Sequence, residues 1–437
     1  MDETTGQTAE PLREYRKTRV LYIIEAMLEY FVNILMSGAY IAKVASTLGM
    51  SDSTVGIVVS LANLGAAFQL FALFFVGRYP MRRRAILFHT VNQAFFALVW
   101  LFPVFRMAAG TKIALFIAVL LGGHILNNVI NSPKIAWYMS MVDDRRRGIF
   151  TAKKEMVSLI GGVAFSFAMG QVIDRCEAAG DLRKAFLIGG VTLCALAALH
   201  TFTLIFSQER PPEQGQHPIR VGKSLRRLFS NRTFLRVLGL TTLCKISESV
   251  ATPFYGTYQV KELGFSMTFV SLLGLLYAVV RVVTSIFLGK FADKTSFARM
   301  LRLCYLFGTL GYVVMIFTVP SNGKVLYTVF YAGFHAIFGA GYTSCMINLI
   351  YDSVDHADRT GAYALFNAFG GLFGFGATLL LSNLVTYIQA NGNRLFGIHA
   401  YAQQFLSALA VAFDLVLVLW LTAEIRYKRK TEKEKTK

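Results

Sequence analysis

The sequence predicts an all-α membrane protein of twelve transmembrane helices, arranged as two like-oriented halves of six. Composition is the first of two observations that predict this class. Hydrophobic residues make up 55% of the 437 and charged residues only 16%, whereas soluble domains carry about 25% charged residues. Mean hydropathy is +0.50. Apolar blocks of about twenty residues recur between short charged joints, and each block is long enough to cross a hydrocarbon core about 30 Å thick.

The second observation is an internal repeat with a very long period. Residues 40–51 and 258–266 both begin with Tyr and end with Leu-Gly-x-Ser, and the joint at Gly77 resembles the joint at Gly289. The offsets, from 212 to 218, are about half of the chain length. A period of this length indicates a duplicated membrane domain and not a short solenoid repeat. Two related halves are typical of transporters in which one half rocks against the other around a central site.

The predicted elements follow in order along the chain. The first eighteen residues are polar and do not resemble a cleavable signal peptide, so we expect the first span to direct insertion. The predicted domains are an N-terminal bundle (1–206), a cytoplasmic linker (207–232) rich in Pro, Gln and basic residues, and a C-terminal bundle with a basic tail (233–437). The predicted spans are 19–45, 53–77, 85–106, 112–138, 151–173 and 184–206, then 234–260, 267–290, 300–319, 325–351, 361–388 and 401–425.

The distribution of basic residues predicts the orientation. If both termini are cytoplasmic, thirty Lys and Arg lie in joints on the cytoplasmic side and nine on the opposite side. Such a bias towards the cytoplasm is typical of plasma-membrane proteins of this kind. The net charge of +19 is then explained by anionic membrane lipid as the counterion, and nucleic acid is not expected as a partner. We expect a monomer in the cell membrane.

Several classes of site are disfavoured by the sequence. The five cysteines are scattered and form no CxxC or Cys/His cluster with metal-ligand spacing. The sequence has no P-loop, no strand-borne GxGxxG and no GxSxG, so ATP-driven transport and familiar nucleophilic catalysis are not expected. We expect neither an enzyme nor a bound cofactor or metal.

One joint carries a recognisable motif. Between the eighth and ninth spans, Gly289, Asp293, Lys294 and Arg299 are spaced as G-x-x-x-D-[RK]-x-x-x-x-[RK]. This pattern resembles the signature of the major facilitator superfamily, bacterial type. The resemblance implies twelve helices and a gating role for these four residues, in which the joint locks the outward-facing state. At the matching joint of the first half, Met81 stands where Asp is expected, which puts a lock there in doubt.

Ionisable and amide side chains inside the spans are the best candidates for the working site, because each is costly in lipid unless it faces a cavity or a partner. In the family arrangement, spans one, four, seven and ten surround the solute, so the polar stripes of these spans are expected to line the central cleft. The first span carries its stripe at three- and four-residue steps, from Tyr22 to Tyr40. The candidate solute and coupling residues are Glu25, Glu29, Asn33, Asn127, Asn131, Lys245, Glu248, Arg281 and His335.

Structural roles compete with functional ones at several of these positions. Glu25 lies near the cytoplasmic end and could pair with a nearby basic residue, whereas the deeper Glu29 favours a coupling role. Lys245 and Glu248 could simply neutralise each other as an i, i+3 pair. Lys134 is interpreted as pairing locally or reaching towards the membrane surface. Asp414 has no obvious partner. The Gly161-Gly162 and Gly370-Gly371 pairs, with Gly374 and Gly376, are interpreted as sites of close helix packing.

These features together predict a secondary active transporter for a small polar or charged solute, coupled to protons or sodium. Span five lacks the Gly-Pro pattern typical of drug antiporters, which disfavours a proton-coupled drug antiporter. A drug or metabolite exporter is kept as one alternative. A sensor or scaffold that kept the fold but lost turnover is the alternative of a different class, and buried charges in both halves favour transport over it. The sequence does not define the solute, the direction of transport or the coupling ion.

Overall fold

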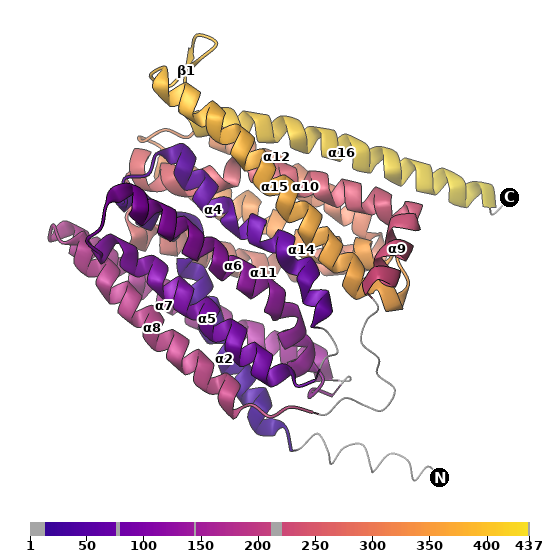
Figure 1. Cartoon of the computed structure of the whole chain (residues 1–437). Helices are drawn as coiled ribbons and strands as arrows, with labels where there is room; N and C mark the ends of the chain where they lie inside the picture. Colours follow the sequence, from indigo (N-terminus) through magenta and orange to yellow (C-terminus); the bar gives the residue numbers. More distant parts are fainter. Residues whose placement is uncertain (1–13, 76–78, 144–145, 211–220, 436–437) are drawn as a thin grey trace.

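Long helices that run side by side make up nearly all of the protein. The computed structural model describes residues 14–75, 79–143, 146–210 and 221–435. In Figure 1 the helix before the linker, α8 (Leu182–Phe206), ends at the same end of the molecule at which the short helix after the linker, α9 (Val221–Ser230), lies. We call this the linker end. The β1–β2 hairpin marks the opposite end, which we call the hairpin end.

The first half consists of helices between residues 16 and 206. The predicted first span is broken into α2 (Arg16–Leu35) and α3 (Gly38–Thr47), which meet at an angle of 49°. Gly38 explains the break, because its φ of +53° is a left-handed conformation that glycine adopts without steric cost. The remaining elements are α4 (Asp52–Ala67), η2 (Phe68–Phe74), α5 (Met81–Leu101), η3 (Phe102–Val104), α6 (Ala109–Met139), α7 (Arg147–Ala178) and α8 (Leu182–Phe206).

The second half begins with a short helix of the linker, α9 (Val221–Ser230), and ends with the long α16 (Ala402–Lys435). Two of its spans contain a π-helical segment, which is often found at functional sites. The elements between α9 and α16 are α10 (Arg232–Thr257), η5 (Tyr258–Glu262), α11 (Met267–Lys294), α12 (Phe297–Ile316), α13 (Gly323–Thr328), η6 (Val329–His335), α14 (Ala336–Tyr351), η7 (His356–Asp358), α15 (Arg359–Ala390), β1 (Arg394–Leu395) and β2 (Ile398–His399).

Each of the twelve predicted spans corresponds to one of these helices or to two or three helical segments that follow one another along the chain. Within the described residues, nine helices are long and apolar enough to cross a membrane, and the bent pair of α2 and α3 makes a tenth. The two other predicted spans fail this test for visible reasons. Lys245 and Glu248 lower the hydropathy of α10, and the π-segment η6 divides the span 323–351 into short pieces.

The two halves meet mainly along two helix pairs, α4 with α15 and α7 with α11. Glycine permits the close approach in both pairs. A Cβ atom at Gly371 would lie 2.3 Å from the Asn63 carbonyl oxygen, and one at Gly170 would lie 2.8 Å from the Met267 carbonyl oxygen. The close packing predicted at Gly161, Gly162, Gly370, Gly371 and Gly374 is confirmed, whereas Gly376 has open space around its α-carbon.

Candidate solute cavity and ion cluster

A cavity of about 190 Å³ lies between the two halves near the middle of the helices. Helices α2, α3 and α7 supply one wall, and η5, α11 and η6 supply the other. Every side chain that lines it is uncharged. Hydroxyl and amide groups dominate its polar surface, and they belong to Tyr30, Ser37, Tyr40, Ser166, Gln259, Ser271 and Tyr331.

A buried hydrogen-bond network closes this cavity towards the hairpin end. The Tyr40 hydroxyl lies 2.6 Å from the Ser166 carbonyl oxygen, to which it donates, and 2.7 Å from the Ser271 hydroxyl. Tyr40 and Ser166 belong to the first half and Ser271 to the second. The two halves are therefore in direct contact at the wall of the cavity.

Further polar contacts join the halves at the hairpin end itself. The Asp174 carboxylate accepts hydrogen bonds from the backbone amides of Met267 (2.7 Å) and Thr268 (2.8 Å), the first residues of α11. The Lys261 ammonium lies 2.6 Å from the Asp52 carboxylate, which also accepts from Gln389 at 2.6 Å. Between the described residues of the two halves, polar contacts occur at this end and in the middle of the helices, where Asn63 donates to Ser249.

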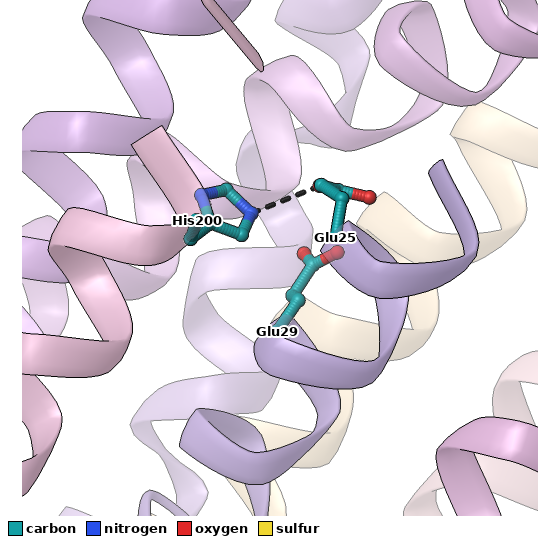
Figure 2. Close-up of side chains that lie close together, drawn as sticks. All are labelled: Glu25, Glu29 and His200. Atoms are coloured by element: carbon teal, nitrogen blue, oxygen red, sulfur yellow. Dashed lines mark hydrogen bonds and ion pairs between the residues drawn. The ribbon is translucent and has the colours of Figure 1, made fainter. Parts of the chain in front are cut away.

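A buried ion cluster lies inside the first half, nearer to the linker end. The Lys134 ammonium of α6 donates to the Glu25 carboxylate at 2.5 Å and to the Glu29 carboxylate at 2.6 Å, both on α2. His200 of α8 lies 2.9 Å from the same Glu25 oxygen through its Nε2 atom. Figure 2 shows the two carboxylates on adjacent turns of one helix, with the imidazole approaching Glu25 from another.

Burial makes the charges of this cluster interdependent. The side chains of Glu25 and His200 are 0% exposed and that of Lys134 is 1% exposed, whereas Glu29 is 12% exposed. Buried charges must be paired to be tolerated. Two carboxylates facing one ammonium leave one negative charge in excess, so the cluster becomes neutral when it holds one further proton. Glu29 is the most exposed of the four side chains.

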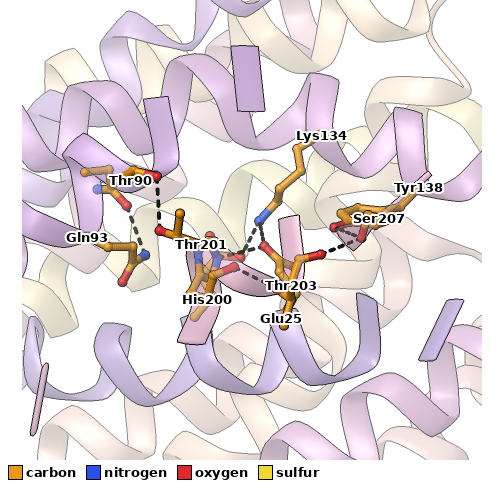
Figure 3. Close-up of polar contacts among 11 residues, drawn as sticks. Glu25, Thr90, Gln93, Lys134, Tyr138, His200, Thr201, Thr203 and Ser207 are labelled. Atoms are coloured by element: carbon orange, nitrogen blue, oxygen red, sulfur yellow. Dashed lines mark hydrogen bonds and ion pairs between the residues drawn. The ribbon is translucent and has the colours of Figure 1, made fainter. Parts of the chain in front are cut away.

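Aromatic and hydroxyl side chains enclose the cluster (Figure 3). The rings of Tyr22 and Tyr138 stack with centroids 4.1 Å apart, and Tyr138 exchanges a hydrogen bond with Ser207. One oxygen each of Glu25 and Glu29 and the Nδ1 atom of His200 are buried without a hydrogen-bond partner among the described residues. These free acceptors give the cluster unused capacity to bind a proton.

The same cluster holds the one group of potential metal ligands that the described residues bring together, namely Glu25, Glu29 and His200. Their ligand atoms lie within 4.8 Å of one another. The Lys134 ammonium already bonds to both carboxylates and supplies the positive charge that a metal would bring. The arrangement therefore favours an ammonium-centred cluster over a metal site.

In the second half, Lys245 and Glu248 form the expected i, i+3 pair at 2.8 Å. Their side chains are 27% and 32% exposed, so this pair is more accessible than the cluster of the first half. The His335 ring lies beside the Tyr277 ring at a tilt of 32°, with centroids 5.2 Å apart, and the Arg281 guanidinium lies over the same tyrosine ring at 5.8 Å. These four candidates therefore gather on α10, α11 and η6, beside the cavity wall.

We expected the polar stripe of the first span to face the central space along its whole length, but it does not. Tyr22 and Glu25 are buried inside the first half, whereas Tyr40, at the other end of the stripe, lines the cavity. Asn33, Asn127 and Asn131 are all half-buried. The Asn127 side-chain oxygen has no hydrogen-bond partner among the described residues.

Sequence reasoning did not identify the roles of two members of the ion cluster. Lys134 was counted among the polar residues of the fourth span but interpreted as pairing locally or reaching towards the membrane surface, although it is the centre of the cluster. A signal existed, because Lys134 follows Asn127 and Asn131 on one face of its helix at four- and three-residue steps. His200 was not considered, and its neighbours in α8 are mainly apolar residues that give no sign of a buried partner.

The predicted gating joint lies at the linker end, between α11 and α12. Asp293 and Lys294 are exposed, Arg299 is half-buried, and Asp293 makes no hydrogen bond or ion pair with any described residue. No described helix packs closely on Gly289, since a Cβ atom there would meet nothing within 4 Å. In the corresponding joint of the first half, Gly77 and Arg78 lie outside the described residues, and the Met81 amide donates to Glu209.

Comparison with known proteins identifies the family. The sequence profile of the Major Facilitator Superfamily matches residues 21–378 and 237–437. This chain belongs to that superfamily. The resemblance carried by the joint motif and the repeat is thereby confirmed, as is the all-α membrane fold, and the chain is a transporter by family.

Relatives of this superfamily member are distant in sequence. An uncharacterized transporter of Bacillus subtilis (strain 168), YwbF, is 24% identical over 180 residues, and the match covers 40% of this chain and 42% of that protein. A mutant form of the nucleoside transporter NupG has a similar structure, with a TM-score of 0.72, 13% identity, and coverage of 93% of this chain and 99% of the other. A D-xylose–proton symporter has a TM-score of 0.67, 14% identity, and coverage of 93% and 96%.

Proposed function

We propose that this protein is a secondary active transporter that moves a small, uncharged, hydroxyl-rich solute by alternating access. The uncharged lining of the inter-half cavity is the observation that carries this proposal. A charged solute in such a cavity would lose its hydration without gaining an ion pair, which is costly. Tyrosine rings and hydroxyl groups instead suit a solute with apolar faces and hydroxyl edges, such as a sugar or a nucleoside.

The ion cluster of the first half is proposed as the coupling site. Glu29 lies next in sequence to Tyr30, which lines the cavity, and is the most exposed member of the cluster. When Glu29 binds a proton, Lys134 is released to pair with Glu25 alone, and the cluster loses its excess negative charge. A rotation of α2 that accompanies this change would reach the cavity wall directly, because Tyr30 is on the same helix.

The orientation proposed from the basic residues assigns the linker end to the cytoplasm. Since the described polar contacts between the halves lie at the hairpin end and mid-helix, this structure then represents a state closed to the outside. An Asp293 without a partner agrees with this assignment, because the joint motif is proposed to lock the opposite, outward-facing state. The protein is proposed to act as a monomer in the cell membrane.

Uptake into proteoliposomes tests this function. A panel of radiolabelled neutral sugars and nucleosides should include a solute that accumulates when a pH gradient is imposed, whereas sugar phosphates and amino acids should not compete with it. Accumulation driven by a sodium gradient at constant pH would show that the coupling ion is sodium and not the proton. Binding of a neutral solute without any uptake would instead identify a sensor that retains the fold.

Glu29→Gln tests the coupling residue within the same assay. This variant mimics the protonated carboxyl, so it should lose gradient-driven accumulation but keep solute exchange, with little dependence on pH. Glu155→Gln is the matched control, because Glu155 is 59% exposed and, within the described part of the chain, forms its ion pair with its neighbour Lys154. Normal, pH-dependent accumulation in Glu29→Gln would show that Glu29 is merely a paired structural charge.

A further inference from the structure

A second buried carboxyl group, Asp414, lies in the other half of the molecule and is not part of the features described above. It belongs to α16, which packs most extensively against α12 and α10. Asp414 is 1% exposed. Its Oδ1 atom accepts a hydrogen bond of 2.5 Å from the Ser247 hydroxyl of α10, whereas its Oδ2 atom is buried without a partner among the described residues.

The surroundings of Asp414 lack a compensating positive charge. No described Lys, Arg or His side chain forms an ion pair with it, and the nearest lysine of α10, Lys245, is paired with Glu248. An ionised carboxylate transferred to an apolar interior without a paired cation is strongly destabilised. The same carboxyl group with a bound proton is neutral, so its burial costs much less free energy.

A small cavity connects Asp414 to the accessible part of this half. It has room for about one water molecule. Glu248 also lines this cavity, and its side chain is 32% exposed. A proton can therefore pass between Glu248 and Asp414 through one water molecule. The titratable groups that face this cavity are Glu248 of α10, Tyr305 and Tyr312 of α12, and His335 of η6.

From this geometry we propose that Asp414 is a proton-binding site of the second half, occupied by a proton in this conformation and exchanging it through Glu248. The site is separate from the ion cluster of the first half. It is also independent of the proposed solute, so its test does not require transport. A sodium ion is the competing occupant, since the cavity is large enough for a small cation and contains carboxyl and phenol oxygens.

Infrared difference spectroscopy of the purified full-length protein at neutral pH tests this proposal. A protonated carboxyl group has a C=O stretching band that an ionised carboxylate lacks. Subtraction of the spectrum of Asp414→Asn should reveal one such band in the wild type. Asp352→Asn, which changes an exposed aspartate at the linker end, is the matched control and should remove none.

Ser247→Ala provides a second variant that does not alter the acid. The band of Asp414 should remain in this variant but shift in frequency, because its hydrogen-bond donor is lost. If no acid band disappears in Asp414→Asn, Asp414 is ionised and the proposal is refuted. A band present in potassium chloride but abolished by sodium chloride would refute it as well, because sodium would then be the natural occupant.

Discussion

The carboxylate of Asp174 provides a direct test of how the two halves are held together at the hairpin end. It caps the first two amides of α11 across the interface between the halves, at 2.7 and 2.8 Å. Replacing a capping carboxylate by alanine typically costs about 0.5–2 kcal/mol. When the halves separate, water hydrates both the carboxylate and the amides, so this free energy is lost only from the closed state.

Asp174→Ala should therefore favour opening at the hairpin end. A change of about 0.5–2 kcal/mol corresponds to a factor of roughly 2–30 in the ratio of open to closed molecules. Ala278 lines the cavity, so a cysteine there, in a background without the native cysteines, reports opening. Its rate of labelling by an impermeant maleimide added at the hairpin side should rise by this factor.

The matched control is Glu177→Gln. Glu177 pairs with Lys43 at 2.5 Å at the same end of the molecule, but both residues belong to the first half. This variant should leave the labelling rate unchanged. An unchanged rate in Asp174→Ala, or an equal increase in both variants, would refute the reasoning that this carboxylate holds the halves together.

Three further predictions follow from features outside the membrane core. Cysteine at Gln214 should be labelled only from the cytoplasm and cysteine at Asn393 only from outside; labelling of both from one face would contradict the orientation. Asp293→Asn should slow transport but leave solute affinity from outside nearly unchanged, because the joint is remote from the cavity, and wild-type turnover would leave the motif without a gating role. Burial raises the pKa of the Asp358 carboxyl, but hydrogen bonds from Arg227 and Ser224 lower it by more. The net effect is a pKa below the ordinary value of 3.8. The stabilisation of the folded protein by the ionised Asp358 carboxylate is therefore complete above about pH 4 and is lost as the pH falls through the lowered pKa. Thermal unfolding should show such an acid-range loss in the wild type and not in Asp358→Asn.

The sequence contained enough information for the membrane spans, because each span needs its own apolar length and the repeat confirms the number in each half. The break between α2 and α3 was not predicted, since it depends on the conformation of Gly38 and not on hydropathy. The π-segment η6 was missed for a similar reason. Its residues are as apolar as those of a regular helix, and only the hydrogen-bond pattern differs.

The candidate site was predictable within single helices but not between them. Three- and four-residue spacing correctly grouped Glu25 with Glu29 and Lys245 with Glu248. Spacing alone does not define how a helix is rotated relative to its neighbours, so it could not show that Glu25 faces α6 and α8. The partner of Asp414 was hidden for the same reason, because Ser247 lies 167 positions away on α10.

The contact between Gly371 and the Asn63 carbonyl has a mechanical consequence. Since the α-carbon of Gly371 meets the Asn63 carbonyl directly, no side chain separates the two helices at this point, and we expect it to serve as a pivot between α4 and α15. Both residues lie near the middle of their helices. A small tilt about this point would spread the hairpin end while it narrows the linker end, and a solute held at mid-depth would scarcely move. A bulky side chain at position 371 would push the two helices apart and should hinder this tilt.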